Sequence, residues 1–185
     1  MTAWILRVSE SKANYWSTYA VDLSLMVFFL AWDASRMGVS PLWMTSLFVA
    51  GAFFWTPVEY AFHRWFYHDG FTLTRNGHEK HHADPTGTVA MPCFVTPLLF
   101  VPLQQLVANY FRASGFSSFL AGWFFGFIAY SFVHHSLHHW KLPFAWYRHL
   151  QSQHRIHHAI PDKNFGVTVR MWDRVFGTEF KKQAP

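Results

Sequence analysis

Histidine is the residue whose number and spacing in this chain could do chemistry. Thirteen histidines occur, all between residues 63 and 158. Twelve of them form four clusters, which are His63 with His68, His78-x-x-His81-His82, His134-His135-x-x-His138-His139, and His154-x-x-His157-His158. Side chains three or four positions apart project from one face of a helix. Each HxxHH motif therefore aims its imidazoles in nearly one direction.

This pattern predicts transition-metal binding by imidazole. Imidazole suits iron, zinc and copper, whereas magnesium and calcium prefer oxygen ligands. The chain has only ten Asp and Glu residues and the single cysteine Cys93, so carboxylate-rich and thiolate sites are not expected. The interval from His63 to His68 is about one and a half helical turns, which suits ligands for two different ions.

Not every histidine is expected to bind metal. His149 stands alone. His135 and His139 point roughly a third of a turn away from His134 and His138, so one of these two pairs is spare.

Polar residues near the clusters are candidates for holding the imidazoles in place. Ligating histidines usually donate their other N–H to a carboxylate or a carbonyl. Glu59 lies one turn before His63, and Asp84 and Asp173 are the other candidate carboxylates. The segments 164–168 and 172–178 are interpreted either as a packing lid or as a support for the 154–158 helix.

Composition indicates a membrane protein. The chain is 51% hydrophobic, 21% aromatic and only 14% charged, which leaves few charges to solvate a surface. Spans of about 20 apolar residues cross a bilayer, and we expect them near 41–61, 92–110, 116–137 and, more weakly, 13–32. Asp22 interrupts the last of these and should face the bundle or an interface. The prolines of 92–110 should kink or break that span.

The distribution of basic residues gives an orientation. With four spans, thirteen of the fifteen Lys and Arg residues fall on the side that carries both ends and the 62–91 loop. Arg36 and Arg112 alone fall on the other side. The positive-inside rule then places every histidine on or near the cytoplasmic side. The basic residues are scattered along the chain, which argues against nucleic-acid binding.

The histidine motifs resemble those of the fatty acid hydroxylase and sterol desaturase superfamily, and most closely its fatty acid 2-hydroxylase branch. The similarity runs from about residue 50 to 180 and begins with Glu59-Tyr60-x-x-His63-Arg64 and the four-residue gap to His68. It continues through the three later histidine clusters to Asn164-Phe-Gly-Val-Thr168 and Trp172-Asp173-x-x-Phe176-Gly177-Thr178. The four-residue gap is typical of the 2-hydroxylase branch.

The resemblance implies an all-α integral membrane protein with about four transmembrane helices under a cytoplasmic, histidine-rich helical cap formed by 63–91 and 138–180. One domain would occupy the whole chain, 1–185. The cap would hold two iron ions, and a purified preparation could carry zinc instead. One ion would take His63, His78, His81, His154 and His157, and the other would take His68, His82, His134, His138 and His158. Glu59, Asp84, Tyr130, Asn164 and Asp173 would surround these ligands.

Two departures from the family pattern bear on function. The family has Tyr-Asp before the third cluster, whereas this chain has Tyr130-Ser131. No segment resembles the haem-binding electron-donor domain of eukaryotic relatives, so we expect electrons from a separate protein.

The leading hypothesis is therefore a membrane-bound non-haem diiron monooxygenase that hydroxylates a long-chain acyl group of a lipid, with carbon 2 as the expected position. The enzymatic alternatives are a carotenoid ring hydroxylase and other lipid oxidations such as desaturation. The non-enzymatic alternative is a histidine-rich metal carrier or transporter. The position of Lys181-Lys182 does not match a dilysine retrieval signal, which favours a bacterial inner membrane over the endoplasmic reticulum.

Overall fold

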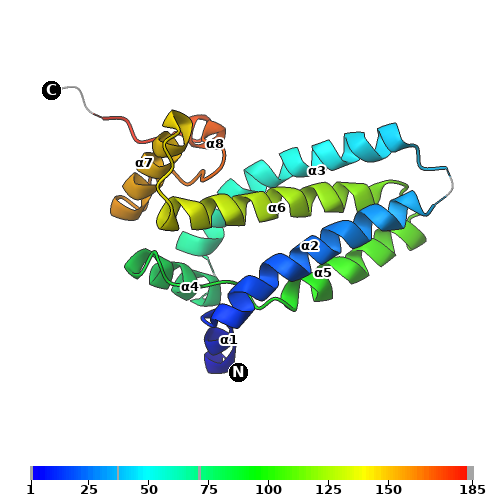
Figure 1. The fold of residues 1–185 in the computed structure, drawn as a ribbon, viewed down its shortest axis with the longest axis horizontal. Helices are drawn as coiled ribbons and strands as arrows, with labels where there is room; N and C mark the ends of the chain where they lie inside the picture. Colours follow the sequence, from blue (N-terminus) through cyan, green and yellow to red (C-terminus); the bar gives the residue numbers. More distant parts are fainter. Residues whose placement is uncertain (1, 37, 71, 183–185) are drawn as a thin grey trace. The chain divides into compact units, whose positions relative to one another are not determined.

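The computed structural model describes residues 2–36, 38–70 and 72–182, and these residues are helical or irregular, without strands (Figure 1). The helices are α1 (Thr2–Ser9), α2 (Lys12–Ala34), α3 (Pro41–Ala61), η1 (Phe62–His68), α4 (Thr72–Ala83), α5 (Val95–Gln105), η2 (Leu106–Tyr110), α6 (Phe116–His139), α7 (Ala145–Ala159) and α8 (Met171–Val175). Two of these elements, η1 and η2, are π-helices. The expectation of an all-α protein is confirmed for the described residues.

The chain divides into two compact units. Residues up to 55 together with 88–129 form the first, here called the apolar unit. Residues 56–87 together with those from 130 onward form the second, here called the histidine unit because it contains all thirteen histidines. The expectation that these units belong to one family domain stays a prediction.

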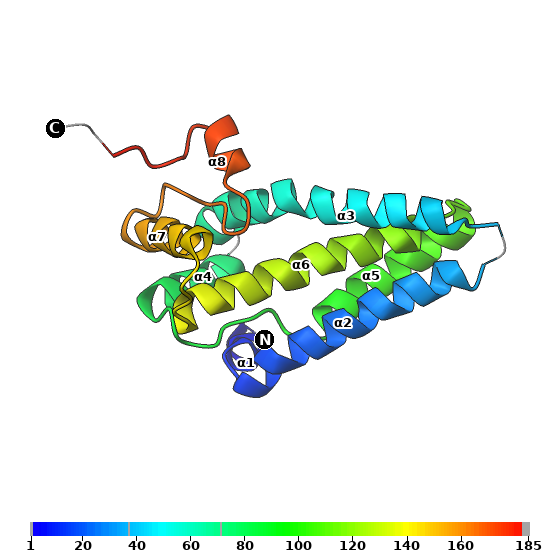
Figure 2. The same cartoon turned by 45° about the horizontal axis from the view of Figure 1, so that its top comes forward.

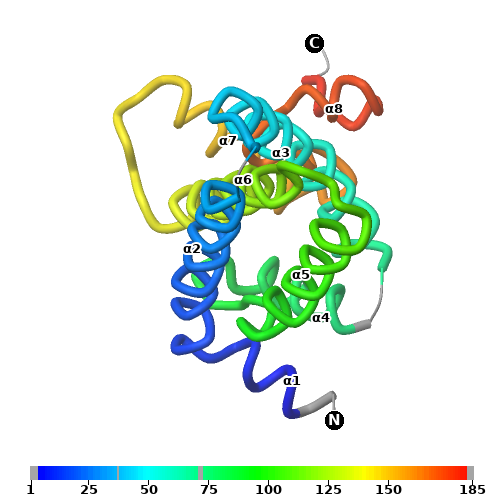
Figure 3. The backbone as a smooth tube through the Cα atoms, turned by 90° about the vertical axis from the view of Figure 1, so that its right-hand side faces the viewer, coloured from blue at the N-terminus to red at the C-terminus, as the bar shows by residue number. Residues whose placement is uncertain are grey.

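The apolar unit is built on α2, α5 and the first parts of α3 and α6, which lie side by side (Figures 2 and 3). Its buried core consists of Leu25, Phe29, Leu120, Ala121 and Phe124. Glycines let α3 and α6 approach each other closely: a Cβ at Gly122 of α6 would lie 1.9 Å from the carbonyl oxygen of Phe48 in α3. Close backbone approach through small residues is typical of helices packed in a membrane.

Two helices of the described residues are long and apolar enough to cross a membrane, namely α3 continued by η1 (Pro41–His68) and α6. The central helix of a soluble protein passes the same test but is mostly buried. Here only 11% of the most apolar window of Pro41–His68 and 39% of that of α6 are buried. These faces are apolar and uncovered, which agrees with a membrane protein.

The other two expected spans, 13–32 and 92–110, are mainly helical, and their crossing of a membrane stays a prediction. Helix α2 covers 13–32, and its Asp22 is buried in the apolar unit, where it accepts a hydrogen bond from the Thr96 hydroxyl at 2.8 Å. The proline-rich segment 92–110 is helical only from Val95, contains Pro102 inside α5, and changes to the π-helix η2. The predicted irregularity of this segment is present.

Candidate metal centre

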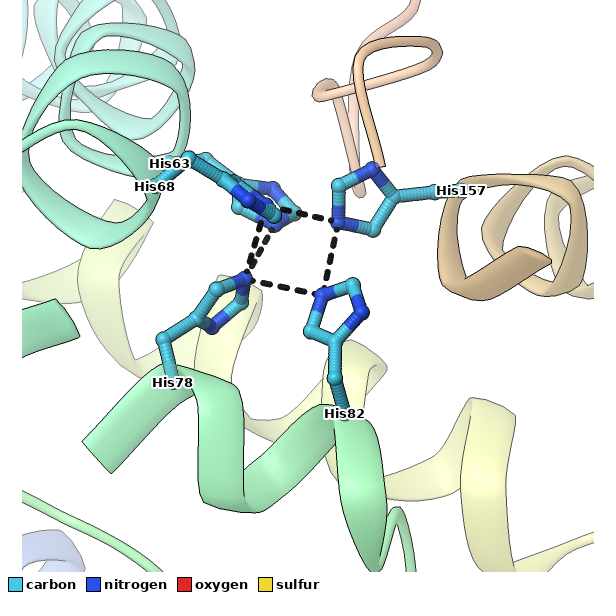
Figure 4. A group of neighbouring side chains, drawn as sticks. All are labelled: His63, His68, His78, His82 and His157. Atoms are coloured by element: carbon cyan, nitrogen blue, oxygen red, sulfur yellow. Dashed lines mark hydrogen bonds between the residues drawn. The ribbon is translucent and has the colours of Figure 1, made fainter. Parts of the chain in front are cut away.

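Ten histidines of the histidine unit form two groups of five. The first group is His63, His68, His78, His82 and His157, and the second is His81, His134, His138, His154 and His158. Within each group, one nitrogen from every ring lies within 4.8 Å of the others. Figure 4 shows the five rings of the first group converging on a common point. These are the ten residues that the sequence predicted as ligands.

Helical spacing explains which histidines meet. Each of the pairs His78/His82, His134/His138 and His154/His158 is four positions apart on an α-helix, and each pair stays in one group. The middle histidine of each HxxHH motif joins the group opposite to its neighbours. His81 thus joins the second group, and His157 joins the first. Each HxxHH motif serves both groups.

The structure corrects the expected division of the ligands. His68 and His82 were expected with the second ion but lie in the first group, whereas His81 and His154 lie in the second group. For His68 the reason is η1, because a π-helix repeats nearly every five residues and returns His68 to the side of His63. The rings of His63 and His68 are stacked with centroids 5.5 Å apart. The sequence argument had assumed α-helical winding.

Backbone carbonyls of the loop after α7 fix two of these rings. The Nδ1–H of His63 donates to the carbonyl of Phe165 at 2.6 Å, and that of His157 donates to the carbonyl of Lys163 at 2.8 Å. A neutral imidazole has only one N–H. The Nε2 atoms of His63 and His157 are therefore bare lone pairs that face the centre of the first group.

The remaining contacts cannot all be hydrogen bonds. His78 Nε2 lies 3.0 Å from both His68 Nε2 and His82 Nε2, and 3.2 Å from His63 Nε2. One Nε2–H can satisfy only one of these three neighbours. A cation at the centre would accept the lone pairs, so these residues fit a transition metal.

The second group makes the same case. His138 Nε2 lies 2.8 Å from His154 Nε2 and 3.3 Å from His134 Nε2. The Nε2 atom of His81 is buried without a hydrogen-bond partner. A buried polar nitrogen without a partner is costly unless a ligand completes it. This group also fits a metal ion.

Burial keeps these imidazoles neutral. It lowers the pKa of His157 to about 3 and the pKa values of His82 and His158 to about 4, and neighbouring imidazoles add to each shift. The pKa of His154 is lowered well below its ordinary value by the same causes. Neutral histidines present lone pairs at neutral pH, which is the form that binds metal.

Two buried carboxylates hold the loop that supplies the carbonyls. Glu59 accepts hydrogen bonds from the backbone N–H groups of Val167 and Thr168, each at 2.8 Å, and from the Thr168 hydroxyl. Asp173 accepts from the N–H groups of Phe165 at 2.8 Å and Gly166 at 2.9 Å. Both carboxylates are almost fully buried. The sequence offered these carboxylates as direct acceptors for the imidazole N–H groups. In the structure they instead hold the loop backbone, and the carbonyls of that loop orient the imidazoles.

Gly166 makes this arrangement possible. A Cβ at this position would lie 2.3 Å from the carbonyl oxygen of Val169 and 2.8 Å from Asp173 Oδ2. Any larger residue would push the carboxylate away from the loop.

The other residues that were predicted to support the ligands, Tyr130, Asn164 and Asp84, make different kinds of contact. Tyr130 stacks on His134 with ring centroids 5.7 Å apart. Asn164 adopts a positive φ of 56°, and its side chain accepts from the N–H of Phe180 at 2.8 Å, which ties the two ends of the loop. Asp84 accepts instead from the N–H and hydroxyl of Thr86 in an exposed turn. Its role is local, because short Asp side chains commonly stabilise such turns.

Further contacts were not foreseen from the sequence. The Tyr147 hydroxyl donates to the carbonyl of Ser136 at 2.6 Å, and Gln151 donates to the carbonyl of Leu137 at 2.7 Å, so α7 is fastened to the end of α6. Tyr67 stacks on His78 with centroids 5.3 Å apart. The only sequence signal was that Tyr147 and Gln151 lie one turn apart, on the face of α7 that also carries His154.

Three histidines lie outside both groups, and these are the three that are absent from the ligand set implied by the resemblance. His135 and His139 stack on each other with centroids 4.1 Å apart, and His149 contacts Arg170.

Known proteins share this chain's pattern. The model of the family described as fatty acid hydroxylase matches residues 48–178. A dihydroceramide fatty acyl 2-hydroxylase of Arabidopsis thaliana is 31% identical over 91% of this chain and 74% of its own length. A ceramide very long chain fatty acid hydroxylase of Saccharomyces cerevisiae is 32% identical over 95% of this chain, which spans 48% of that relative.

A solved structure has the same fold. The structure of full-length scs7p, in which only the hydroxylase domain is visible, superposes with a TM-score of 0.79. It is 29% identical in sequence, and the similarity covers 97% of this chain and 70% of that one.

Proposed function

Because this chain belongs to the fatty acid hydroxylase family, we propose that it hydroxylates carbon 2 of a long-chain acyl group in a membrane lipid. The observation that carries this proposal is the pair of five-histidine groups, whose neutral rings direct lone pairs at two points. Two iron ions are the proposed occupants, and zinc fits the same rings. The ten grouped histidines are the proposed ligands.

The family membership makes the chain a hydroxylase, and the named relatives act on acyl chains of ceramides or dihydroceramides. The comparisons do not support the carotenoid ring hydroxylase or the metal carrier that the sequence left open. A carrier would also distribute its ligands along a path, whereas here ten of the thirteen histidines form two compact groups.

The bound metal pair, with dioxygen and electrons from a separate donor protein, supplies the oxidising power that an unactivated C–H bond requires. The chain's own residues prepare the site. Phe165 and Lys163 fix the two rings whose Nδ1–H groups they accept, so that the opposite nitrogens stay directed at the centre. Glu59 and Asp173 hold that loop rigid through its backbone N–H groups.

Packing of aromatic and imidazole rings shields part of the site from water. His63 and His157 are almost completely buried, and Phe165 lies against both rings with centroids 5.8 and 5.6 Å away. A site that excludes water also prevents the loss of reactive species in side reactions.

The proposed setting is a multi-pass membrane protein with spans near 13–32, 41–61, 92–110 and 116–137 and the histidine-rich cap on the cytoplasmic side. The uncovered apolar faces of α3 and α6 and the position of thirteen of the fifteen basic residues support it. The acyl substrate would then reach the site from within the lipid. A bacterial inner membrane is the proposed location.

Lipid analysis of cells that express the chain tests the function. The wild-type chain should add 2-hydroxylated acyl chains to host lipids, and His81→Ala should abolish them. His139→Ala is the matched control, because this histidine lies outside both groups, and it should retain the product. Hydroxylation at another carbon, desaturated products, or an active His81→Ala variant would contradict the proposal.

A further inference from the structure

A pocket of about 310 Å³ with a mixed polar and apolar lining lies in the apolar unit, at the ends of α2 and η2 and in the loop before α6. It contains two arginines. Its lining residues are Asp33, Arg36, Val39, Ala108, Asn109, Arg112, Ala113 and Ser114. None of these residues belongs to either histidine group.

The arginines are not neutralised by a carboxylate that points at them. Arg36 donates to the carbonyl of Ala108 and the side-chain oxygen of Asn109, which are both uncharged, and its guanidinium lies 5.1 Å from the Trp32 ring centroid. Arg112 makes no side-chain hydrogen bond or ion pair with the residues that the structure describes. A guanidinium has five N–H donors, so most of this donor capacity is unused.

The carboxylate in the pocket wall, that of Asp33, forms hydrogen bonds with α6 and not with the two arginines. Asp33 is 2% exposed, and its Oδ2 accepts from the N–H of Ser118 at 2.7 Å and from the Ser118 hydroxyl at 2.8 Å. It therefore caps the first turn of α6. With two guanidiniums and one carboxylate, the formal charge of the pocket is +1, which suits an anion with a single negative charge.

Surrounding side chains place the pocket at the level of lipid headgroups. Tyr110 and Phe111 are 77% and 65% exposed beside it, and Trp43 donates its indole N–H to the carbonyl of Ser114 in the pocket wall. Aromatic residues gather at both membrane interfaces. Arg36 and Arg112 are also the only basic residues outside the proposed cytoplasmic segments, although membrane proteins generally avoid Lys and Arg there.

The backbone at Arg112 gives a second sign of a functional constraint. This residue has a positive φ of 51°, which side-chain-bearing residues rarely adopt and which costs about 1 kcal/mol or more. The chain holds this conformation at the residue that contributes the unpaired guanidinium.

We propose that this pocket binds the phosphodiester group of an anionic glycerophospholipid, with Arg36 and Arg112 as the two cationic donors. Guanidinium groups bind phosphate oxygens through paired, charge-assisted hydrogen bonds. The proposal rests on the membrane setting proposed above but is independent of the metal site and of the reaction.

Native mass spectrometry of the full chain in detergent tests this site. Phosphatidylglycerol and phosphatidylcholine with identical acyl chains are titrated against the wild type, Arg112→Gln, and the double variant Arg36→Gln/Arg112→Gln. The wild type should prefer phosphatidylglycerol. Arg112→Gln should weaken phosphatidylglycerol binding by roughly tenfold and the double variant by more, with phosphatidylcholine little changed.

Arg7→Gln/Arg148→Gln is the matched control, since both arginines are exposed and the net charge changes equally. The control should bind phosphatidylglycerol like the wild type, and equal weakening in the control would overturn the proposal. Arg112 makes no side-chain hydrogen bond or ion pair with the described residues, so Arg112→Gln should fold, and unchanged binding by this variant and the double variant would also overturn the proposal.

Competition with inorganic phosphate distinguishes binding of a phospholipid headgroup from binding of a free phosphate ion. An equal concentration of phosphate should leave the lipid bound, and displacement would overturn the lipid assignment. Metal content measured on the same samples should stay constant. A loss of lipid binding with intact metal content thus separates failure at this pocket from failure of the proposed reaction centre.

Discussion

The two units differ in how their buried carboxylate, amide and imidazole groups find partners. In the apolar unit the buried carboxylates and amides have partners within the chain: Asp22 pairs with Thr96, Asp33 with Ser118, and Gln104 donates to Ser117 at 3.0 Å. In the histidine unit ten imidazoles gather with too few protons to satisfy one another. Both arrangements cost desolvation, but only the second stays incomplete without an added cation. Comparing the number of N–H and O–H protons with the number of acceptor atoms in a buried cluster therefore distinguishes polar groups that stabilise the fold from polar groups that bind a ligand.

The largest expected effect is loss of activity when one ligand is removed from either group. His78→Ala in the first group and His154→Ala in the second should each lower lipid hydroxylation by on the order of 100-fold or more, because each change removes a lone pair from a metal. The readout is hydroxylated acyl product per cell. The comparison with His139→Ala is decisive, and equal activities in all three variants would show that the groups are not the reaction centre.

The next effect concerns the loop that orients the rings. Asp173→Ala leaves the buried N–H groups of Phe165 and Gly166 without an acceptor, which should cost roughly 2 to 4 kcal/mol of stability. Metal affinity should fall by about 10- to 100-fold, because Phe165 no longer holds His63. Metal competition with a chelator measures this.

Asp162→Ala is the matched control for that change. Its carboxylate is exposed and pairs with Lys163 at 3.5 Å, so stability should change by less than about 0.5 kcal/mol. If Asp173→Ala and Asp162→Ala bind metal equally well, the loop has no role in holding the rings.

A smaller effect is expected in the apolar unit. Gly122→Ala places a methyl group against the Phe48 carbonyl and should lower stability by about 1 to 3 kcal/mol, with the metal content of folded protein unchanged. Ala50→Val, on the exposed part of α3, should be nearly neutral. Thermal unfolding in detergent compares the two. If folded Gly122→Ala protein lost metal, packing in the apolar unit and metal binding in the histidine unit would not be independent.

The mildest test is the pH dependence of the metal-free chain. Burial lowers the pKa of His157 to about 3 and that of His82 to about 4, whereas unfolded histidines titrate near 6.5. The unfolded chain then binds more protons, so stability is complete above about pH 6.5 and declines as the pH falls toward 4. Melting curves from about pH 8 to 4.5 should show this decline, and bound metal should reduce it. A chain that becomes more stable in acid would contradict buried, neutral rings.

The histidine motifs, together with the family resemblance that they carry, were enough to predict the all-α fold class and the ten grouped histidines. Helical periodicity separates the pair His134/His138 from the pair His135/His139, but only the resemblance indicated which pair would bind metal. The placement of His68 in the group of His63 could not be predicted, because it depends on the π-helical winding of η1 and nothing in the sequence of Phe62–His68 indicates that winding. The carbonyls that orient the imidazoles could not be predicted either. Every residue has a carbonyl, and only the folded loop places those of Phe165 and Lys163 beside His63 and His157.

The count of bound metal tests the central claim most directly. Elemental analysis of the purified full chain should find about two transition-metal ions per molecule. His157→Ala and His158→Ala change adjacent residues that belong to different groups, and each should reduce the count to about one. The double variant should bind close to none. A wild-type chain saturated at one ion, or two ions retained in both single variants, would contradict an account built on two five-histidine groups.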